Sequence, residues 1–291
     1  MTGGLDGPNA GNDALDKLIM GVENLPPTPA LVTNLLAIFK QPDVDVDRVV
    51  KLIRNDPPLT AEVLRRCNSA YFAGEQVSDI FDAVTRLGFY QVYRVVVTIA
   101  GSRTMRAVPA GCGLRLEELW EHSFETAVAA GLIAHKLKEP DGAAFTAGLL
   151  HDVGKIVLAS AGGAKYAMLK EMASVPGVTL PSVEADMFGF DHAAVGGRLL
   201  NRWKLPPEVT AAVAGHHDFL KAGPHTRLAA TVAVADTVAH SLREEAEGKP
   251  LCFTNCLHAL GFLGLDHEDG LQILERVKCD LEQEQGMMAT L

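Results

Sequence analysis

Residues 149–155 read Leu-Leu-His-Asp-Val-Gly-Lys and close an apolar run that predicts a helix. An imidazole and a carboxylate in adjacent positions, here His151 and Asp152, can coordinate one divalent ion, and the carboxylate can bridge to a second ion. Lys155 follows three residues after Asp152, so on a helical turn its ammonium group would reach an oxygen of a bound phosphate. The stretch therefore predicts a metal-binding turn, with Asp152 and Lys155 as candidate catalytic residues.

Two predicted helices outside this stretch carry further candidate ligands. Glu118 and His122 are four residues apart and therefore share one helical face. His192 follows Asp191, a favourable N-cap residue, at the start of another predicted helix. Taken alone, each of these residues is equally consistent with a solvated or hydrogen-bonded position on a helix.

Two more candidates lie in apolar segments further along the chain. His216 and His217 end the segment 206–217, and Asp236 interrupts the apolar run 229–240. An unpaired carboxylate would be costly to bury, and a metal ion would supply its partner. A solvent-facing orientation explains Asp236 equally well, and two adjacent histidines also suit a solvated helix end, where they favour the helix dipole.

The other histidines and the cysteines show no comparable pattern. Five histidines are expected to be surface or local hydrogen-bonding residues: His135, His225, His240, His258 and His267. Cys252 and Cys256 are four residues apart, but no second pair at zinc-finger spacing accompanies them, so no zinc site is expected there. Five cysteines without a framework spacing fit free thiols in the cytoplasm.

Composition and charge exclude several classes of protein. The chain has 291 residues, of which 48% are hydrophobic, and a formal net charge of −10. A sizeable core is therefore expected, whereas binding to nucleic-acid phosphates or to an anionic membrane surface is disfavoured. No uncharged apolar stretch reaches the roughly 18 residues of a membrane span, and the polar, acidic N-terminus does not resemble a secretory signal.

Hydrophobic periodicity predicts an all-α protein. Residues 1–14 read as a flexible leader, 15–108 as an N-terminal helical lobe, 109–246 as a second helical lobe with the metal site, and 247–291 as a helical extension. Residues 89–101 have high β-propensity but are predicted to form a buried helix, because the neighbouring segments are helical. Further helices are predicted over 115–138, 142–150, 156–174, 191–203, 207–215, 225–246 and 266–288.

Three segments of the first lobe carry a resemblance to a known family. They are LPPTPALVTNLLAIF at 25–39, IRNDPPLTAEVLRRCNSAYF at 53–72 and DAVTRLGFYQVYRVVV at 82–97. Together with the order His, His-Asp, His, His-His, Asp in the second lobe, they make the chain resemble the HDOD domain. This is an output domain of bacterial signalling proteins related to the HD superfamily of metal-dependent phosphohydrolases. The resemblance covers about residues 17–215 and implies an N-terminal lobe packed on an HD-like metal-binding lobe.

The resemblance also implies a binuclear site of the kind found in HD-GYP-type phosphodiesterases. Its ligands would be Glu118, His122, His151, Asp152, His192, His216, His217 and Asp236. Asp152 would bridge two ions that activate a water for attack on phosphorus, and Lys155 would stabilise the phosphoryl oxygens. Mixed nitrogen and oxygen ligands favour iron or manganese, with zinc, cobalt and nickel as alternatives.

The chain departs from the family pattern in two ways. HDOD domains commonly lack much of the ligand set and are then non-catalytic signalling modules, whereas this chain has a candidate at every ligand position. Residues 218–225 contain no Gly-Tyr-Pro, so specificity for cyclic di-GMP does not carry over.

Three interpretations therefore remain open. The first is a metal-dependent phosphohydrolase or phosphodiesterase acting on a small phosphorylated ligand or nucleotide. The second is a non-catalytic signal-transduction scaffold that binds a signalling protein and whose metal site is structural or vestigial. The third is a plain helical domain, which predicts that the histidines do not converge in space. None of them involves nucleic acid or a membrane.

Overall fold

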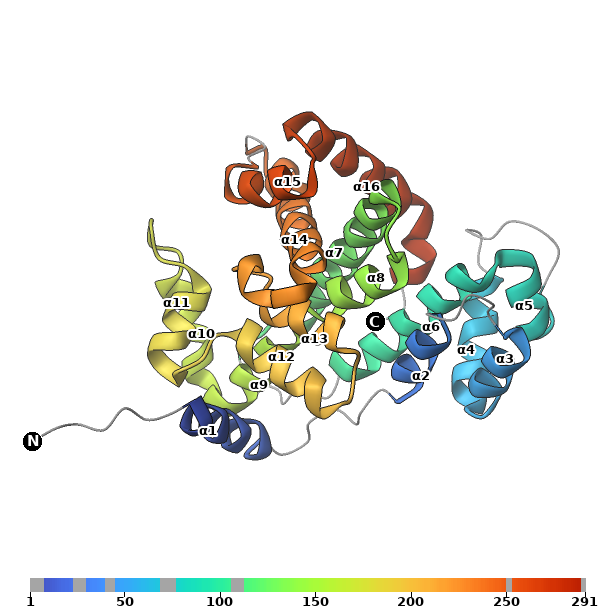
Figure 1. The fold of residues 1–291 in the computed structure, drawn as a ribbon, viewed down its shortest axis with the longest axis horizontal. Helices are drawn as coiled ribbons and strands as arrows, with labels where there is room; N and C mark the ends of the chain where they lie inside the picture. Colours follow the sequence, from blue (N-terminus) through green and yellow to red (C-terminus); the bar gives the residue numbers. More distant parts are fainter. Residues whose placement is uncertain are drawn as a thin grey trace, which may run out of the picture.

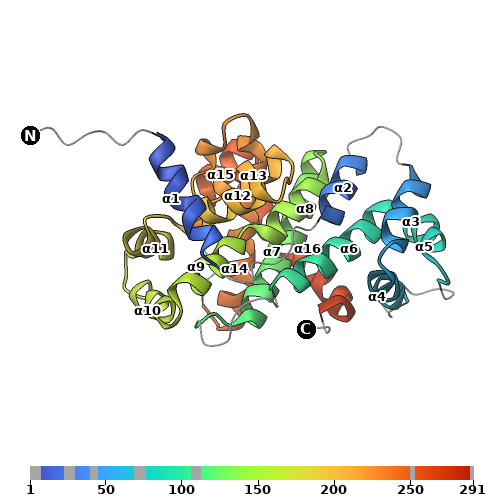
Figure 2. The same ribbon diagram turned by 90° about the horizontal axis from the view of Figure 1, so that it is seen from below.

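The computed structural model describes residues 8–22, 30–39, 45–68, 77–105, 113–249 and 253–288, and every regular element within these ranges is a helix. The all-α prediction is therefore confirmed. Figures 1 and 2 show that α3, α4 and α5 lie at one end of the longest axis and that α10 and α11 lie at the other, with α1 nearby. The other helices of the HD-like lobe lie between these ends.

The helices before residue 113 make up the N-terminal part of the fold. They are α1 (Pro8–Met20), α2 (Ala30–Phe39), α3 (Val46–Arg54), α4 (Pro57–Cys67), α5 (Ile80–Leu87) and α6 (Phe89–Met105). Asp45, Asp56 and Asp79 are the N-caps of α3, α4 and α5, and each carboxylate accepts a hydrogen bond from a first-turn backbone amide. Helix α6 confirms the helix predicted over 89–101, because burial of its valines in the core outweighs their β-propensity.

The remaining helices form the HD-like lobe and the C-terminal extension. They are α7 (Leu116–Leu137), α8 (Asp141–Leu150), α9 (Val153–Gly162), α10 (Ala164–Met172), α11 (Leu180–Phe188), α12 (His192–Arg202), α13 (Pro207–Ala214), η2 (Phe219–His225), α14 (Thr226–Ala246), η3 (Thr254–Cys256), α15 (Leu257–Leu263) and α16 (His267–Met288).

Two predicted boundaries differ from those in the structure, and one helix was not predicted. The leader expected over 1–14 is at least partly helical, because α1 already begins at Pro8. The single helix expected over 156–174 is two helices, because Gly163 adopts a φ of 54° that ends α9 before α10 begins. Helix α11 was not predicted at all. The predicted link at 108–114 lies mostly outside the described residues, as does Cys252.

The N-terminal lobe is joined to the HD-like lobe chiefly through α6 and α8. The hydroxyl of Tyr93 on α6 is hydrogen-bonded to the Thr146 hydroxyl and lies 3.2 Å from the carbonyl oxygen of Gly142 on α8. At the other end of the contact, Gly101 leaves room for the side chain of Leu149. These contacts place α8, which ends at the His151-Asp152 turn, against the N-terminal lobe.

The apolar stretch Asp141–Gly162 is long enough to cross a membrane by length and composition alone. Most of it is buried inside the protein, and the His151-Asp152 turn divides it into α8 and α9. Its hydrophobicity is therefore explained by its place in the core.

Candidate metal centre

Two close helix contacts bring the candidate ligands together. Gly148 on α8 lies so near α7 that an added Cβ would be 2.9 Å from the Cα of Ala127. Gly154 on α9 faces α12, and an added Cβ there would be only 1.9 Å from the carbonyl oxygen of His192. The glycine of the predicted metal-binding turn therefore allows α9 and α12 to touch at the residue that begins α12.

The first group of candidate ligands comes from α7, α14 and the turn after α8. His122, His151 and Asp236 offer ligand atoms that all lie within 4.8 Å of one another. The shortest contact, 2.9 Å, joins His122 Nε2 to Asp236 Oδ1, and His151 Nε2 lies 3.6 Å from the same oxygen. Both imidazoles are buried, so Asp236 is not the solvent-facing carboxylate of the alternative interpretation.

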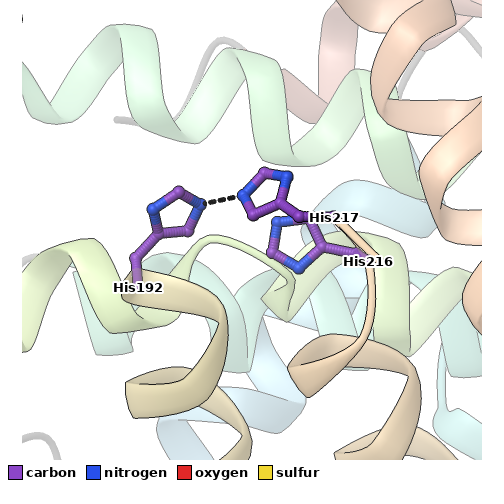
Figure 3. Close-up of side chains that lie close together, drawn as sticks. All are labelled: His192, His216 and His217. Carbon is purple, nitrogen blue, oxygen red and sulfur yellow. Dashed lines mark hydrogen bonds between the residues drawn. The ribbon is translucent and has the colours of Figure 1, made fainter. Parts of the chain in front are cut away.

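The second group comes from the start of α12 and the turn after α13. His192, His216 and His217 also offer ligand atoms within 4.8 Å of one another. Figure 3 shows His192 facing His217 across the site, with their Nε2 atoms 2.8 Å apart. Asp191 caps α12 by accepting a hydrogen bond of 2.8 Å from the Ala194 amide, as its position before His192 predicted.

Asp152 lies between these two groups and is 1% exposed. Its Oδ2 is 3.4 Å from His151 Nε2 and 3.8 Å from His122 Nε2. Its Oδ1 points the other way and lies 3.2 Å from His192 Nε2. One carboxylate therefore contacts histidines of both groups, which is the geometry of a bridging ligand.

Backbone carbonyls fix the orientation of two of the imidazoles. His151 Nδ1 lies 2.7 Å from the carbonyl oxygen of Gly148, and His216 Nδ1 lies 2.7 Å from that of Val213. A carbonyl oxygen can only accept, so in both rings Nδ1 carries the hydrogen and donates it. In the neutral rings Nε2 is left with its lone pair directed into the site, as a metal ligand requires.

These residues fit a divalent metal ion. The Nε2 atoms of His151 and His216 are buried and make no hydrogen bond with any described part of the chain. An unpaired buried polar atom is costly, and a cation that accepts its lone pair removes that cost. Imidazole nitrogen and carboxylate oxygen together are suited to transition metals.

The electrostatics of the centre are dominated by burial and by the two carboxylates. Burial lowers the pKa of His122 to about 4 and holds that of His216 well below its ordinary value. Burial acts on His151 in the same direction, but Asp152 and Asp236 outweigh it and raise the pKa of His151 to about 10. A metal ion would therefore displace a proton from His151 on binding.

A cleft of about 910 Å³ opens beside the centre. Its lining includes five of the candidate ligands, namely Asp152, His192, His216, His217 and Asp236. The C-terminal extension contributes Thr254, His258 and Ala259 to the same lining. A small ligand in this cleft would therefore reach the centre.

Lys155 and Glu118 occupy different positions relative to this centre. The ammonium of Lys155 also lines the cleft and lies 2.5 Å from Asp152 Oδ2. The structure does not bring Glu118 into either group. Its carboxylate pairs with Arg115 at the start of α7, and only its backbone oxygen reaches further, to accept a hydrogen bond from Arg243.

Sequence reasoning missed two residues at the centre. His240, which was expected to be incidental, lies one turn after Asp236 on α14, and its ring is 4.5 Å from that of His122. Its spacing of four residues from Asp236 was the available signal. Glu184 on the unpredicted helix α11 is fully buried and lies 2.5 Å from His192 Nδ1. No sequence pattern pointed to it.

These features define a class of protein, the all-α proteins with an HD-type centre of histidines and aspartates. The family model of the HDOD domain matches residues 25–219. The chain belongs to the HDOD domain family. The histidines converge, so the interpretation as a plain helical domain with scattered histidines is wrong.

Solved structures of similar fold cover nearly the whole chain. An HDOD domain protein of unknown function from Geobacter sulfurreducens aligns with a TM-score of 0.74 and 27% identity, over 96% of this chain and 97% of that one. A candidate phosphohydrolase from Shewanella amazonensis aligns with a TM-score of 0.72 and 26% identity, over 94% and 96% of the two chains.

Curated relatives are longer than this chain. It is 26% identical over 223 residues to a protein of Treponema pallidum, which covers 74% of this chain and 42% of that one. It is 29% identical over 198 residues to Ribonuclease Y from Opitutus terrae, covering 66% and 30% of the two chains. The chain therefore spans less than half the length of these relatives.

Proposed function

We propose that this protein is a metal-dependent phosphohydrolase or phosphodiesterase that holds two divalent ions and acts on a small phosphorylated ligand or nucleotide. The observation that carries the proposal is the position of Asp152. Its two oxygens face separate groups of histidines, at 3.2 Å from His192 Nε2 and 3.4 Å from His151 Nε2. A buried carboxylate in this position is suited to bridge a pair of ions.

The residues of the chain would divide the work of hydrolysis. When bound, the pair of ions would lower the pKa of a water and offset charge on the phosphoryl group. Asp152 would hold the two sites at a fixed separation. The Lys155 ammonium, already in the cleft beside Asp152, would turn toward a phosphoryl oxygen and stabilise the charge that develops there.

The charge of the cleft favours a small anion over a long polyanion. The described residues that line the cleft include four carboxylates and one ammonium group. The carboxylates belong to Asp152, Asp218, Asp236 and Glu244, and the ammonium group belongs to Lys155. With neutral histidines the formal charge is −3, and two divalent ions would bring it to +1. Binding of a phosphoester would therefore depend on the ions. The net charge of −10 disfavours binding of RNA by this chain. This proposal differs from the activity that the name Ribonuclease Y gives for one group of relatives.

Iron or manganese are the metals we favour, because the ligand set mixes imidazole and carboxylate. Zinc, cobalt and nickel accept the same ligands and are the alternatives. The resemblance of the fold to the Shewanella amazonensis candidate phosphohydrolase supports the reaction class.

Elemental analysis followed by turnover assays tests this proposal. The purified protein should contain close to two equivalents of transition metal after reconstitution with Fe²⁺ or Mn²⁺. It should then hydrolyse members of a panel of phosphomonoesters, phosphodiesters and cyclic nucleotides, but not an RNA oligonucleotide. Asp152→Asn should abolish turnover, and His135→Asn, which changes an exposed histidine on α7, should not. Less than half an equivalent of metal together with no turnover would overturn the proposal.

One observation favours a second candidate function, that of a non-catalytic signalling scaffold in the cytoplasm. The described residues that line the cleft all lie between Asp152 and Ala259. The lobe formed by α2–α6 therefore contributes none of them and is left for another role, such as binding a signalling protein. Metal-dependent hydrolysis that is lost in Asp152→Asn would rule out a purely scaffolding function.

A further inference from the structure

We infer that Glu184 is a positioning residue that gives the His192 group its affinity for an ion, by holding His192 and by supplying negative charge from behind it. The inference rests on the proposed function, because it assigns a role within the proposed binuclear centre. It adds a helix, α11, that neither the sequence patterns nor the ligand order connects with metal binding.

The contacts of Glu184 are unusually complete for a buried carboxylate. Its Oε2 accepts hydrogen bonds from both the backbone amide of His192, at 2.9 Å, and from Nδ1 of the same residue, at 2.5 Å. Its Oε1 accepts a hydrogen bond of 2.7 Å from the hydroxyl of Tyr166 on α10. All three side chains are buried. Glu184 therefore fixes both the backbone and the ring of His192.

The carboxylate also determines which nitrogen of His192 faces the ion. A carboxylate on Nδ1 keeps the hydrogen there, so Nε2 is the atom directed at Asp152 Oδ1, 3.2 Å away. Such an outer carboxylate makes an imidazole a stronger ligand than a neutral acceptor does. His151 and His216 have only backbone carbonyls in the equivalent position, so His192 differs from them in kind.

The two groups of ligands differ in charge in a way that Glu184 offsets. The His122 group includes a carboxylate of its own, Asp236, and shares Asp152. The His192 group consists of three imidazoles, and its carboxylate is the shared Asp152. A dipositive ion at the second group would thus be poorly balanced by its direct ligands. The Glu184 carboxylate supplies negative charge from the far side of the His192 ring, where it contacts Nδ1.

Helix α11 is held to the body of the protein partly through this contact. Val183 and Glu184 are its buried residues, and Figures 1 and 2 show α10 and α11 together at the end of the molecule. Removal of the Glu184 charge must therefore be distinguished from loosening of the helix. Val183→Ala provides the matched control, because it removes buried packing from the same helix and leaves the carboxylate in place.

The test is a titration of the metal-free full chain with Co²⁺, followed by visible absorption, for the wild type, Glu184→Gln and Val183→Ala. We expect the wild type to bind two ions. Glu184→Gln keeps the shape of the side chain but removes its charge, and we expect it to bind the first ion with unchanged affinity and the second about 10- to 100-fold more weakly. Val183→Ala should bind both ions as the wild type does, although it should melt at a lower temperature.

Proton NMR supplies a readout that a purely structural role would not move. The short hydrogen bond from His192 Nδ1 to a carboxylate should give a strongly downfield imidazole proton in the wild type and in Val183→Ala. In Glu184→Gln this signal should move upfield or vanish. Equal affinities for the second ion in the wild type and in Glu184→Gln would overturn the inference. It would also be overturned if Glu184→Gln weakened the binding of both ions equally, or if Val183→Ala weakened binding of the second ion as much as Glu184→Gln does. A wild type that binds no ion would overturn the proposed function as well, so the two failures are distinguishable.

Discussion

The buried carboxylate of Asp152 lies beside several positively charged or hydrogen-bonding groups, and these groups determine its protonation state. Lys155 and His151 both approach its Oδ2, at 2.5 Å and 3.4 Å. Although burial alone would raise the pKa of Asp152, these positive partners hold it well below its usual range. The carboxylate is therefore ionised at every pH at which the protein is expected to work, and a metal ion competes with the Lys155 ammonium for Asp152 and with protons on the histidines.

The stability of the chelator-treated protein should be greatest near pH ~6.5, the ordinary pKa of histidine. Burial lowers the pKa of His122 to about 4 in the folded protein. Between pH ~4 and ~6.5 His122 is therefore protonated in the unfolded chain but not in the folded one, so the free energy of unfolding falls as the pH falls. Burial also acts on His151, but Asp152 and Asp236 raise its pKa to about 10. The folded state holds that proton above ~6.5, so stability falls as the pH rises. Urea unfolding across this range measures both limbs.

The control for this pH profile is His135→Asn, which removes an exposed histidine of α7 and should leave both limbs in place. His151→Asn should make the alkaline limb less steep, and His192, whose pKa is also raised by Asp152 and Glu184 against the effect of burial, should supply the slope that remains. A free energy of unfolding that stays constant between about pH 5 and 9 in the wild type would contradict the argument.

Substitution of Lys155 should separate metal binding from chemistry. Lys155→Met removes the ammonium but keeps most of the aliphatic length, and none of the atoms in the two ligand groups belongs to Lys155. We expect both ions to stay bound and kcat to fall about 100-fold, the usual cost of losing one donor to a developing oxyanion. Lys221→Met, at an exposed lysine paired with Asp218, should leave kcat unchanged. An unaltered kcat in Lys155→Met would refute the role assigned to Lys155.

At the scale of the helices, the predictions succeeded where the apolar pattern and the helix caps agreed. The residues from 191 onward were predicted as a helix because Asp191 is a favourable cap and the apolar residues that follow are regularly spaced, and α12 begins at His192. Helix α11 is the exception, because it was missed although Leu180, Val183 and Phe188 are spaced as on one face of a helix and pack on the core. Glu184 gave no signal of its own, because a single glutamate on a helix is usually exposed to solvent.

The contact between α9 and α12 should not tolerate a methyl group. In Gly154→Ala the new Cβ would lie 1.9 Å from the carbonyl oxygen of His192, a backbone atom that cannot move without displacing the start of α12. Overpacking of this kind costs about 1–3 kcal/mol, and separation of Asp152 from His192 should also weaken binding of the second ion. Urea denaturation and metal titration measure the two effects.

A second glycine provides the comparison for Gly154→Ala. Gly261 lies within α15 and has no atom within 4 Å of an added Cβ. Gly261→Ala should therefore leave metal binding unchanged and stabilise the protein by up to about 1 kcal/mol, because alanine has the higher helix propensity. Wild-type metal affinity in Gly154→Ala would show that the close contact does not position the centre.

Across the whole molecule, the centre is made by segments that are far apart in the sequence. Ligand candidates come from α7, the turn after α8, α12, the turn after α13, and α14. Periodicity can place each residue on a helix, but it cannot show that five segments converge, because convergence depends on how the helices pack. The expectation that they converge came from the order of the motifs, which resembles that of the HDOD domain. The resemblance identified the candidate ligands, but it did not identify the residues that position them, such as Glu184 and Gly154.

Because the centre joins these segments, removal of metal should lower the stability of the whole HD-like lobe. An ion present at 100 times its dissociation constant stabilises the folded state by about 2.7 kcal/mol. For a chain of this size 1 kcal/mol corresponds to about 2–4 °C, so chelation should lower the melting temperature by about 5–10 °C per ion. The far-ultraviolet circular dichroism at room temperature should stay unchanged, because the helices are held by the apolar core.

In Asp152→Asn, which lacks the shared carboxylate, added metal should shift the melting temperature much less than in the wild type. A wild-type melting temperature that does not respond to chelation and reconstitution would show that the buried histidines and aspartates hold no metal.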